Sequence, residues 1–140
     1  MDRRLFLVST FALAGCSGDT ERQTVICDRG LSDVLMRART AYGREGALVI
    51  NEAGAGELLD RAENEPSALV VTRQSLLANR LQRLGYVRLE HRWQARIGDD
   101  TVQLLVTKGG GPAQWRALAF AKWLASDAAA PQLKGGTTAP

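Results

Sequence analysis

Few side chains of this sequence are placed for catalysis. His91 is the only histidine, so no second imidazole can complete a metal site with it. No serine or cysteine lies in a nucleophile motif, and no acid–base pair has a convincing spacing. His91 also takes an inward slot of an alternating strand pattern between Leu89 and Trp93, which is typical of a core or interface histidine. We therefore expect no enzyme, no metal and no cofactor.

Arg73 is the cation best placed to bind a ligand. It lies in the loop Thr72–Ser75, directly after the apolar run Ala68–Val71. That loop is expected at the carboxyl end of a parallel strand, where open α/β sheets bind their ligands. Arg73 would pair there with an anion or with a carboxylate of a partner. The alternative is that Thr72 caps the next helix while Arg73 is solvated.

The elements that must position this loop alternate between strands and helices. Apolar runs predict strands over 24–27, 47–50 and 68–71, and each is followed by an amphipathic helical run. Gly43 and Gly46 mark the end of the first helix, and Gly85 the end of the third. This order predicts a three-layer α/β/α domain with a mainly parallel sheet. The residues expected to face inward on the three helices are Leu31, Val34, Leu35, Ala38 and Tyr42, then Leu58, Leu59 and Ala62, then Leu76, Leu77, Leu81 and Leu84.

The chain then changes to an antiparallel hairpin and a last helix. A strand that starts at Val87 alternates apolar and polar residues, and Gly98–Asp100 turns it into a second strand over 101–107. Pro112 opens the last helix. We expect the tryptophans in the core, or in a docking patch if they remain exposed. The predicted inward residues are Val87, Leu89, Trp93, Ala95 and Ile97 on the strand, and Trp115, Leu118, Ala119, Lys122 and Trp123 on the helix.

The amino terminus has the features of a bacterial lipoprotein signal. A short cationic start precedes the apolar run Leu5–Ala14, which is too short to span a bilayer. Leu13–Cys16 resembles a lipobox, so Cys16 would be lipidated and become the mature terminus. Arg3–Leu7 resembles the twin-arginine consensus, although Asp2 departs from it, so export by either that route or the general secretory route is expected. We therefore predict a signal peptide over 1–15, a lipidated tether over 16–23, a domain over 24–134 and a flexible tail over 135–140.

Composition is consistent with one small envelope domain. Without the 15 residues of the signal, 125 of the 140 residues remain, which is enough for one core. The mature part keeps 16 of the 18 basic and 14 of the 15 acidic side chains, a balance that argues against nucleic acid as a partner. Because Cys16 is committed to lipid, Cys27 has no intramolecular disulfide partner, and its strand-like surroundings predict a small buried hydrophobe.

Three segments carry a resemblance to a known family. The Leu31–Leu35 helix start, the run Ala68–Leu77 and the closing Phe120–Leu133 resemble the molybdate-type periplasmic solute-binding proteins of ABC transporters. The resemblance covers roughly residues 23–134 and implies an oxyanion bound in a cleft between two α/β lobes. This chain has room for a single lobe, because a hairpin stands where the second lobe would be inserted, between Tyr86 and Thr101. A single lobe cannot close around a ligand.

The resemblance also implies which loops would hold the oxyanion. The family uses serine hydroxyls and helix-start amides, whereas this chain has Asp28–Ser32 at the first loop and Asn51–Glu57 at the second. Backbone amides can still cradle an anion, but Asp28, Glu52 and Glu57 oppose it, and Ser32 is expected to be a helix N-cap. The small residues would otherwise form tight turns. The candidate ligand-binding residues are Gly30, Gly54, Ala55, Gly56, Thr72 and Arg73.

Two functions follow as expectations. The first is a lipid-anchored binding protein of an oxyanion uptake system, held on the periplasmic side of the cell envelope, with weak or lost solute binding. The second is an accessory lipoprotein whose single lobe docks a protein, such as a transporter, another membrane protein or a second copy of itself.

Overall fold

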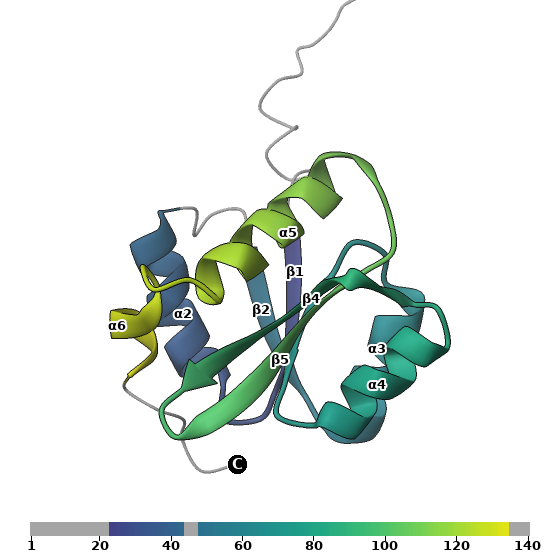
Figure 1. Ribbon diagram of the computed structural model, residues 1–140, viewed down its shortest axis with the longest axis horizontal. Coiled ribbons are helices and arrows are strands. Elements are labelled where there is room, and N and C mark those ends of the chain that lie inside the picture. Colours follow the sequence, from purple (N-terminus) through teal and green to yellow (C-terminus); the bar gives the residue numbers. More distant parts are fainter. Residues whose placement is uncertain (1–22, 44–47, 135–140) are drawn as a thin grey trace, which may run out of the picture.

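Strands and helices alternate along the chain as the sequence predicts (Figure 1). The computed structural model describes residues 23–43 and 48–134, so the predicted signal, Cys16, most of the tether, Gly46, Ala47 and the tail lie outside the described residues. No helix in the described ranges is long and apolar enough to cross a membrane. The elements are β1 (Gln23–Asp28), α2 (Ser32–Tyr42), β2 (Leu48–Ala53), α3 (Ala55–Asn64), β3 (Leu69–Thr72), α4 (Ser75–Arg83), β4 (Val87–Ile97), β5 (Asp100–Thr107), α5 (Gly111–Leu124) and α6 (Ala130–Leu133).

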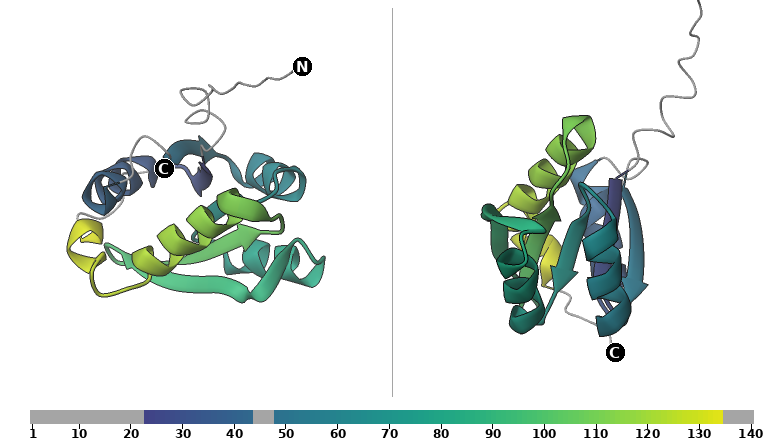
Figure 2. Two further views of the ribbon diagram at one scale, coloured as in Figure 1. Left: turned by 90° about the horizontal axis from the view of Figure 1, so that it is seen from above. Right: turned by 90° about the vertical axis from the view of Figure 1, so that its right-hand side faces the viewer.

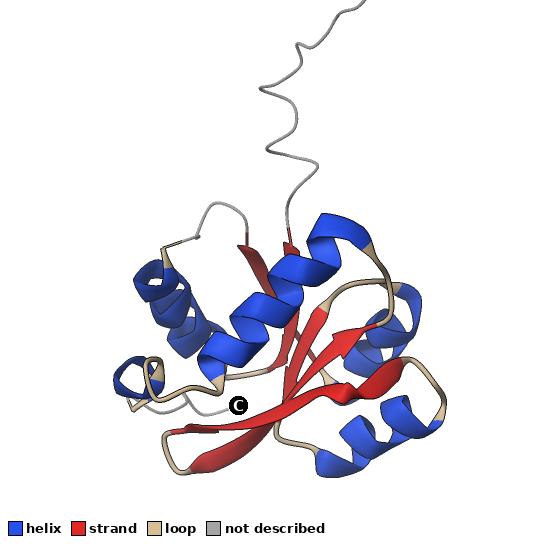
Figure 3. Ribbon diagram, turned by 45° about the horizontal axis from the view of Figure 1, so that its top comes forward, coloured by secondary structure: helices blue, strands red, loops and turns tan. Residues whose placement is uncertain are grey.

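The strands form one five-stranded sheet in the order β2-β1-β3-β5-β4. β1 pairs in parallel with β2 and β3, whereas β5 is antiparallel to both β3 and β4 (Figure 3). Four strands therefore share one direction and β5 alone is reversed. The predicted hairpin is confirmed, since Ile97 pairs with Asp100 across the turn. The sheet is mixed, because β5 lies between β3 and β4.

Helices cover both faces of the sheet, which gives the predicted three layers (Figure 2). On one face, α2, α5 and α6 pack on alternate residues such as Val25, Val71 and Leu104. On the other face, α3 and α4 pack on the intervening residues, such as Ile26 and Val70. β1 and β3 are buried on both faces, as their continuous apolar runs predict.

Aromatic side chains join α2 to α5. The rings of Tyr42 and Phe120 are 5.0 Å apart between centroids, and Trp123 lies 5.1 Å from Tyr42. Phe120 is fully buried and Trp123 partly buried, so the prediction that Trp123 belongs to the core is close to the structure. α2 ends at Gly43, whose φ of 87° is a conformation that glycine adopts at low cost.

The prediction that Leu89 faces inward is wrong, because its side chain is 70% exposed. Val87 pairs with Thr107 and Arg92 with Leu105, so β4 advances five residues where β5 advances two. Because β4 has three extra residues here, an odd number, its odd-numbered side chains point to opposite faces of the sheet before and after the shift. Val87 accordingly packs with α3 and α4, whereas Trp93 and Ile97 pack with α2, α5 and α6.

The predicted inward faces of α4 and α5 are also partly wrong. Leu76 is 82% exposed, Leu84 52% and Trp115 78%, and Ala119 and Lys122, also predicted to face inward, are exposed. On α4 the buried set is Leu77, Ala78 and Leu81, with Gly85 ending the helix as predicted at a φ of 87°. On α5 the small Ala117 and Ala121 let the helix approach the sheet beside Phe120, and this turns Trp115 to the outside. The residues that α5 buries are Ala117, Phe120, Ala121 and Leu124.

Candidate functional site

The three predicted ligand loops meet at one edge of the sheet, at the carboxyl ends of β1, β2 and β3. They form an open pocket of about 270 Å³. Of the predicted residues, Gly54, Ala55 and Arg73 line this pocket, whereas Gly30, Gly56 and Thr72 do not. The full lining is Asp28, Arg29, Ala53, Gly54, Ala55, Arg73 and Gln74.

The Glu52 carboxylate accepts hydrogen bonds from backbone amides at the start of α2. Its Oε2 accepts hydrogen bonds from the backbone N–H groups of Gly30 and Ser32, both at 3.2 Å, and from the Ser32 hydroxyl at 2.5 Å. These hydrogen bonds, led by that of the Ser32 hydroxyl, lower the pKa of Glu52 below its usual value. The protein's own carboxylate therefore stands where the resemblance places an oxyanion.

Ser32 does not act as the predicted N-cap. Leu31 is the N-cap residue, and no side chain caps the helix from that position. Ser32 is the first helical residue, and its hydroxyl donates to Glu52 on β2 instead. The helix start is thus capped from a neighbouring strand.

Asp28 accepts the hydrogen bonds at the third loop, as Glu52 does at the start of α2. Its Oδ2 accepts a hydrogen bond from the Thr72 hydroxyl at 3.1 Å and from the Arg73 N–H at 2.7 Å. Thr72 is fully buried, and its Oγ1 accepts the Gln74 N–H at 3.0 Å. The Thr72 side chain therefore fixes the turn before α4, which is close to the alternative that Thr72 caps the next helix. Its hydroxyl is not directed to a ligand.

Arg73 ties three segments together rather than standing in solvent. Its Nε donates to Asp100 Oδ2 at 3.0 Å, and its Nη1 donates to the Arg29 carbonyl at 3.1 Å and lies 3.9 Å from Asp28 Oδ2. The Nη2 atom is buried and has no hydrogen-bond partner among the described residues. Asp100, in the hairpin turn, was not predicted to belong to this site, because no local pattern joins it to a loop 27 residues earlier.

The start of α3 is the part of this edge that resembles an anion site most closely. Gly54 is its N-cap residue, and no side chain caps the helix from there. The Arg29 guanidinium lies over it, since a Cβ placed on Gly54 would be 3.6 Å from Arg29 Nη2. Glu57 stands in the first turn of α3 and opposes an anion there. The Arg29 guanidinium therefore makes the start of α3 a cationic part of the open pocket.

His91 and Cys27 do not form a catalytic group in the described part of the chain. His91 is half-buried, and its Nδ1 lies 3.4 Å from Gln114 Nε2, on the face of β4 toward α5. Cys27 is fully buried as predicted. Burial, with Glu52 and Asp28 nearby, raises the pKa of Cys27 to about 12, so its thiol is not a nucleophile near neutral pH. Across residues 23–43 and 48–134, no group of three or more His, Cys, Asp or Glu side chains is placed to hold a metal ion.

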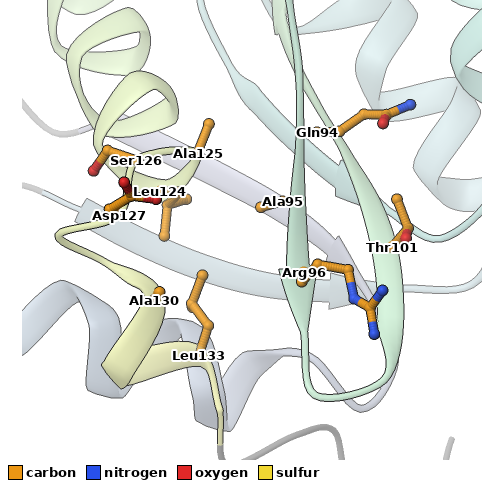
Figure 4. A pocket seen from close by; sticks show the side chains of 10 residues that line it. All are labelled: Gln94, Ala95, Arg96, Thr101, Leu124, Ala125, Ser126, Asp127, Ala130 and Leu133. Atoms are coloured by element: carbon orange, nitrogen blue, oxygen red, sulfur yellow. The ribbon is translucent and has the colours of Figure 1, made fainter.

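A second hollow, of about 380 Å³, lies beside the edge strand β4. In Figure 4, Ala95 faces Leu124 and Leu133 across it, while the Gln94 side chain points away from α6. Its walls combine alanine and leucine side chains with five polar or charged residues, which are Gln94, Arg96, Thr101, Ser126 and Asp127. The two charged lining residues, Arg96 and Asp127, are of opposite sign, so this hollow favours an anion less than the loop edge with Arg29 and Arg73 does.

Comparison with known proteins identifies no relative. No protein-family model matches the chain, and no curated protein or solved structure matches it significantly.

Proposed function

We propose that this protein is an envelope lipoprotein, anchored through Cys16, with a single solute-binding-protein-like lobe of an ABC-type uptake system and with weak or lost oxyanion binding. The proposal rests on the signal-like sequence before Cys16 and on the resemblance of residues 23–134 to molybdate-type binding proteins. The mixed α/β fold, with its three loops at one edge, is compatible with such a lobe.

The hydrogen bonds that Glu52 accepts support the proposed loss of oxyanion binding. Two amides and a hydroxyl at the α2 start already have a carboxylate acceptor, and Asp28 satisfies the donors at the third loop in the same way. An incoming oxyanion would have to displace a covalently attached carboxylate that is present at a high effective concentration. Each lost hydrogen bond to a charged group removes about 1.5–3 kcal/mol, and about 1.4 kcal/mol is tenfold in affinity.

Calorimetric titration with molybdate, tungstate, sulfate and phosphate tests this proposal. The full lipidated chain in detergent should bind with a dissociation constant in the high micromolar range or weaker. Glu52→Ala should bind at least about tenfold more tightly, since it frees the α2 amides. Glu90→Ala makes the same charge change on exposed β4 and should match the wild type. Submicromolar binding by a wild-type monomer would overturn the proposal, and tight binding in a dimer alone would mean that a second copy supplies the missing wall.

A docking module is the second candidate, and Leu76 favours it. This side chain is 82% exposed at the start of α4, two residues after Gln74 in the pocket wall and close in sequence to Arg73. Exposed hydrophobic side chains and arginine are both frequent in protein contact surfaces. Native mass spectrometry of the protein from its own host should then show a transporter, another membrane protein or a second copy bound, and Leu76→Asp should release it. A monomer without a bound protein would exclude this function.

A further inference from the structure

The end of the sheet opposite the candidate site carries exposed hydrophobic side chains. Trp115 is 78% exposed in the first turns of α5, and Leu84 and Leu89, on either side of the start of β4, are 52% and 70% exposed. Between them Tyr86 is 37% exposed, and its carbonyl accepts the Lys108 N–H at 2.9 Å. Scattered exposed hydrophobes are ordinary, but a group at one end of a domain indicates a contact surface.

Basic side chains surround Trp115 at this end. Arg88 and His91 from β4 and Lys108 from the loop after β5 line an open pocket of about 260 Å³ with Trp115. No aspartate or glutamate lines the pocket, and the first turn of α5 has neither a capping side chain nor an acidic residue. Glu90 is the one carboxylate within 84–91 and 108–116. The charge of this pocket is therefore complementary to an anionic group.

The chain enters the domain beside this pocket. The Gln23 side-chain amide, at the start of β1, donates to the Ser67 carbonyl, and the Ser67 N–H donates to the Lys108 carbonyl at 3.1 Å. Ser67 also touches Gly109 so closely that a Cβ at that position would lie 1.9 Å from the Ser67 hydroxyl oxygen. Figures 1 and 2 show the start of β1 and the amino-terminal end of α5 at the same end of the molecule.

The length of chain before Gln23 keeps this end close to any lipid on Cys16. Six residues lie between Cys16 and Gln23, so seven Cα–Cα steps join the two positions. A fully extended chain of that length spans at most about 25 Å. The anchor of the proposed function would therefore hold this end of the domain, and not the loop edge, near the bilayer surface.

We propose that Trp115, Arg88 and Lys108 form a membrane-docking surface for anionic phospholipid, an inference that rests on the proposed lipid anchor. Trp115 enters the headgroup layer, where the amphipathic indole ring is favoured. Arg88 and Lys108 pair with lipid phosphates beside it. The lipid supplies attachment, and this surface fixes orientation, so the loop edge with Arg29 and Arg73 faces away from the membrane.

Fluorescence quenching on vesicles tests the surface separately from the anchor. The full lipidated chain is floated with phosphatidylcholine vesicles that contain or lack phosphatidylglycerol, with part of the lipid brominated near the head of its acyl chains. We expect quenching that depends on phosphatidylglycerol, weakens in high salt and disappears in Trp115→Phe, since Trp93 and Trp123 are partly buried elsewhere. Arg88→Gln with Lys108→Gln should lower the ratio of docked to undocked protein roughly thirty-fold, because each base near an anionic surface contributes about fivefold.

The matched control carries Arg37→Gln with Lys122→Gln, which changes the charge equally on exposed positions of α2 and the last turn of α5. It should be quenched like the wild type. If the protein floats but Trp115 is not quenched, the proposed docking surface is refuted and the proposed lipid anchor is not. Protein that does not float would overturn both. Trp115 that is protected in native membranes but unquenched on vesicles would mean a protein partner and would also overturn the proposal.

Discussion

Glu52→Ala is expected to destabilise the fold through the start of α2. The wild-type carboxylate accepts two backbone N–H groups and the Ser32 hydroxyl, and no side chain caps the helix from Leu31. Truncation leaves these donors to water and removes a negative charge from the positive end of the helix dipole.

The expected loss in the free energy of unfolding is that of a lost helix cap. Removal of an N-cap side chain costs about 0.5–2 kcal/mol, and loss of the charge at a helix start adds about 0.3–1 kcal/mol. Glu52 is exposed, so solvent screening keeps the total near the lower end of the sum, at about 1–2 kcal/mol. For a domain of this size the melting temperature should fall by roughly 4–10 °C. Glu52→Gln, which keeps an acceptor oxygen, should lie between the wild type and Glu52→Ala.

Denaturant unfolding over a range of pH measures this effect and its sign. The folded state lowers the pKa of Glu52 from its usual 4.5, chiefly through the hydrogen bond from Ser32. Stability from Glu52 is therefore present above the unfolded pKa and is lost as pH falls through the folded pKa. The difference between wild type and Glu52→Ala should be largest near neutral pH and should shrink in acid.

Glu90→Ala is the control, since it removes a carboxylate from an exposed position and should leave the free energy of unfolding unchanged within about 0.5 kcal/mol. If Glu52→Ala were as stable as this control at neutral pH, the capping role of Glu52 would be refuted. A difference that grew in acid would refute the charge argument even if the variant were unstable.

Two further predictions follow from the cysteines. Because burial raises the pKa of Cys27 to about 12, native protein at pH near 8 should alkylate this thiol about a thousandfold more slowly than protein in denaturant, as mass spectrometry of the Cys27 peptide can show; equal rates would contradict its burial. Cys16→Ser should leave the membrane fraction after a high-salt wash that removes electrostatically held protein, and variant that stays bound would refute the lipid anchor.

Most of the fold could be predicted from the local sequence because the residues of the hydrophobic core follow short, regular patterns. The continuous apolar runs in β1 and β3 require burial on both faces, and this requirement places helices on both sides of the sheet. Glycines at residues 43, 85 and 98 ended elements where the pattern predicted, and each has a positive φ. The turn at Gly98 was therefore enough to predict the β4–β5 hairpin.

The failures arise where tertiary pairing overrides local periodicity. Leu89 follows the alternation of β4, but three extra residues relative to β5 reverse the alternation before Arg92. α5 is apolar on more than one side, so periodicity did not distinguish the Phe120 face from the Trp115 face. At the candidate site, glycines marked the loops correctly, but the hydrogen bonds of Glu52 and Asp28 span 20 or more residues and have no local signature.

The register shift in β4 also protects the protein from self-association. β4 is an outer strand of the sheet, and its free backbone edge would otherwise be a template for a strand of another chain. The shift interrupts the regular spacing of N–H and C=O groups between Val87 and Arg92, and Arg88 and Arg96 place exposed positive charges along the same strand. Two such edges brought together would face like charges and an irregular ladder. If the proposed lipid anchor holds the protein on a two-dimensional membrane, its copies meet often, and this edge then lowers the risk of sheet-to-sheet aggregation.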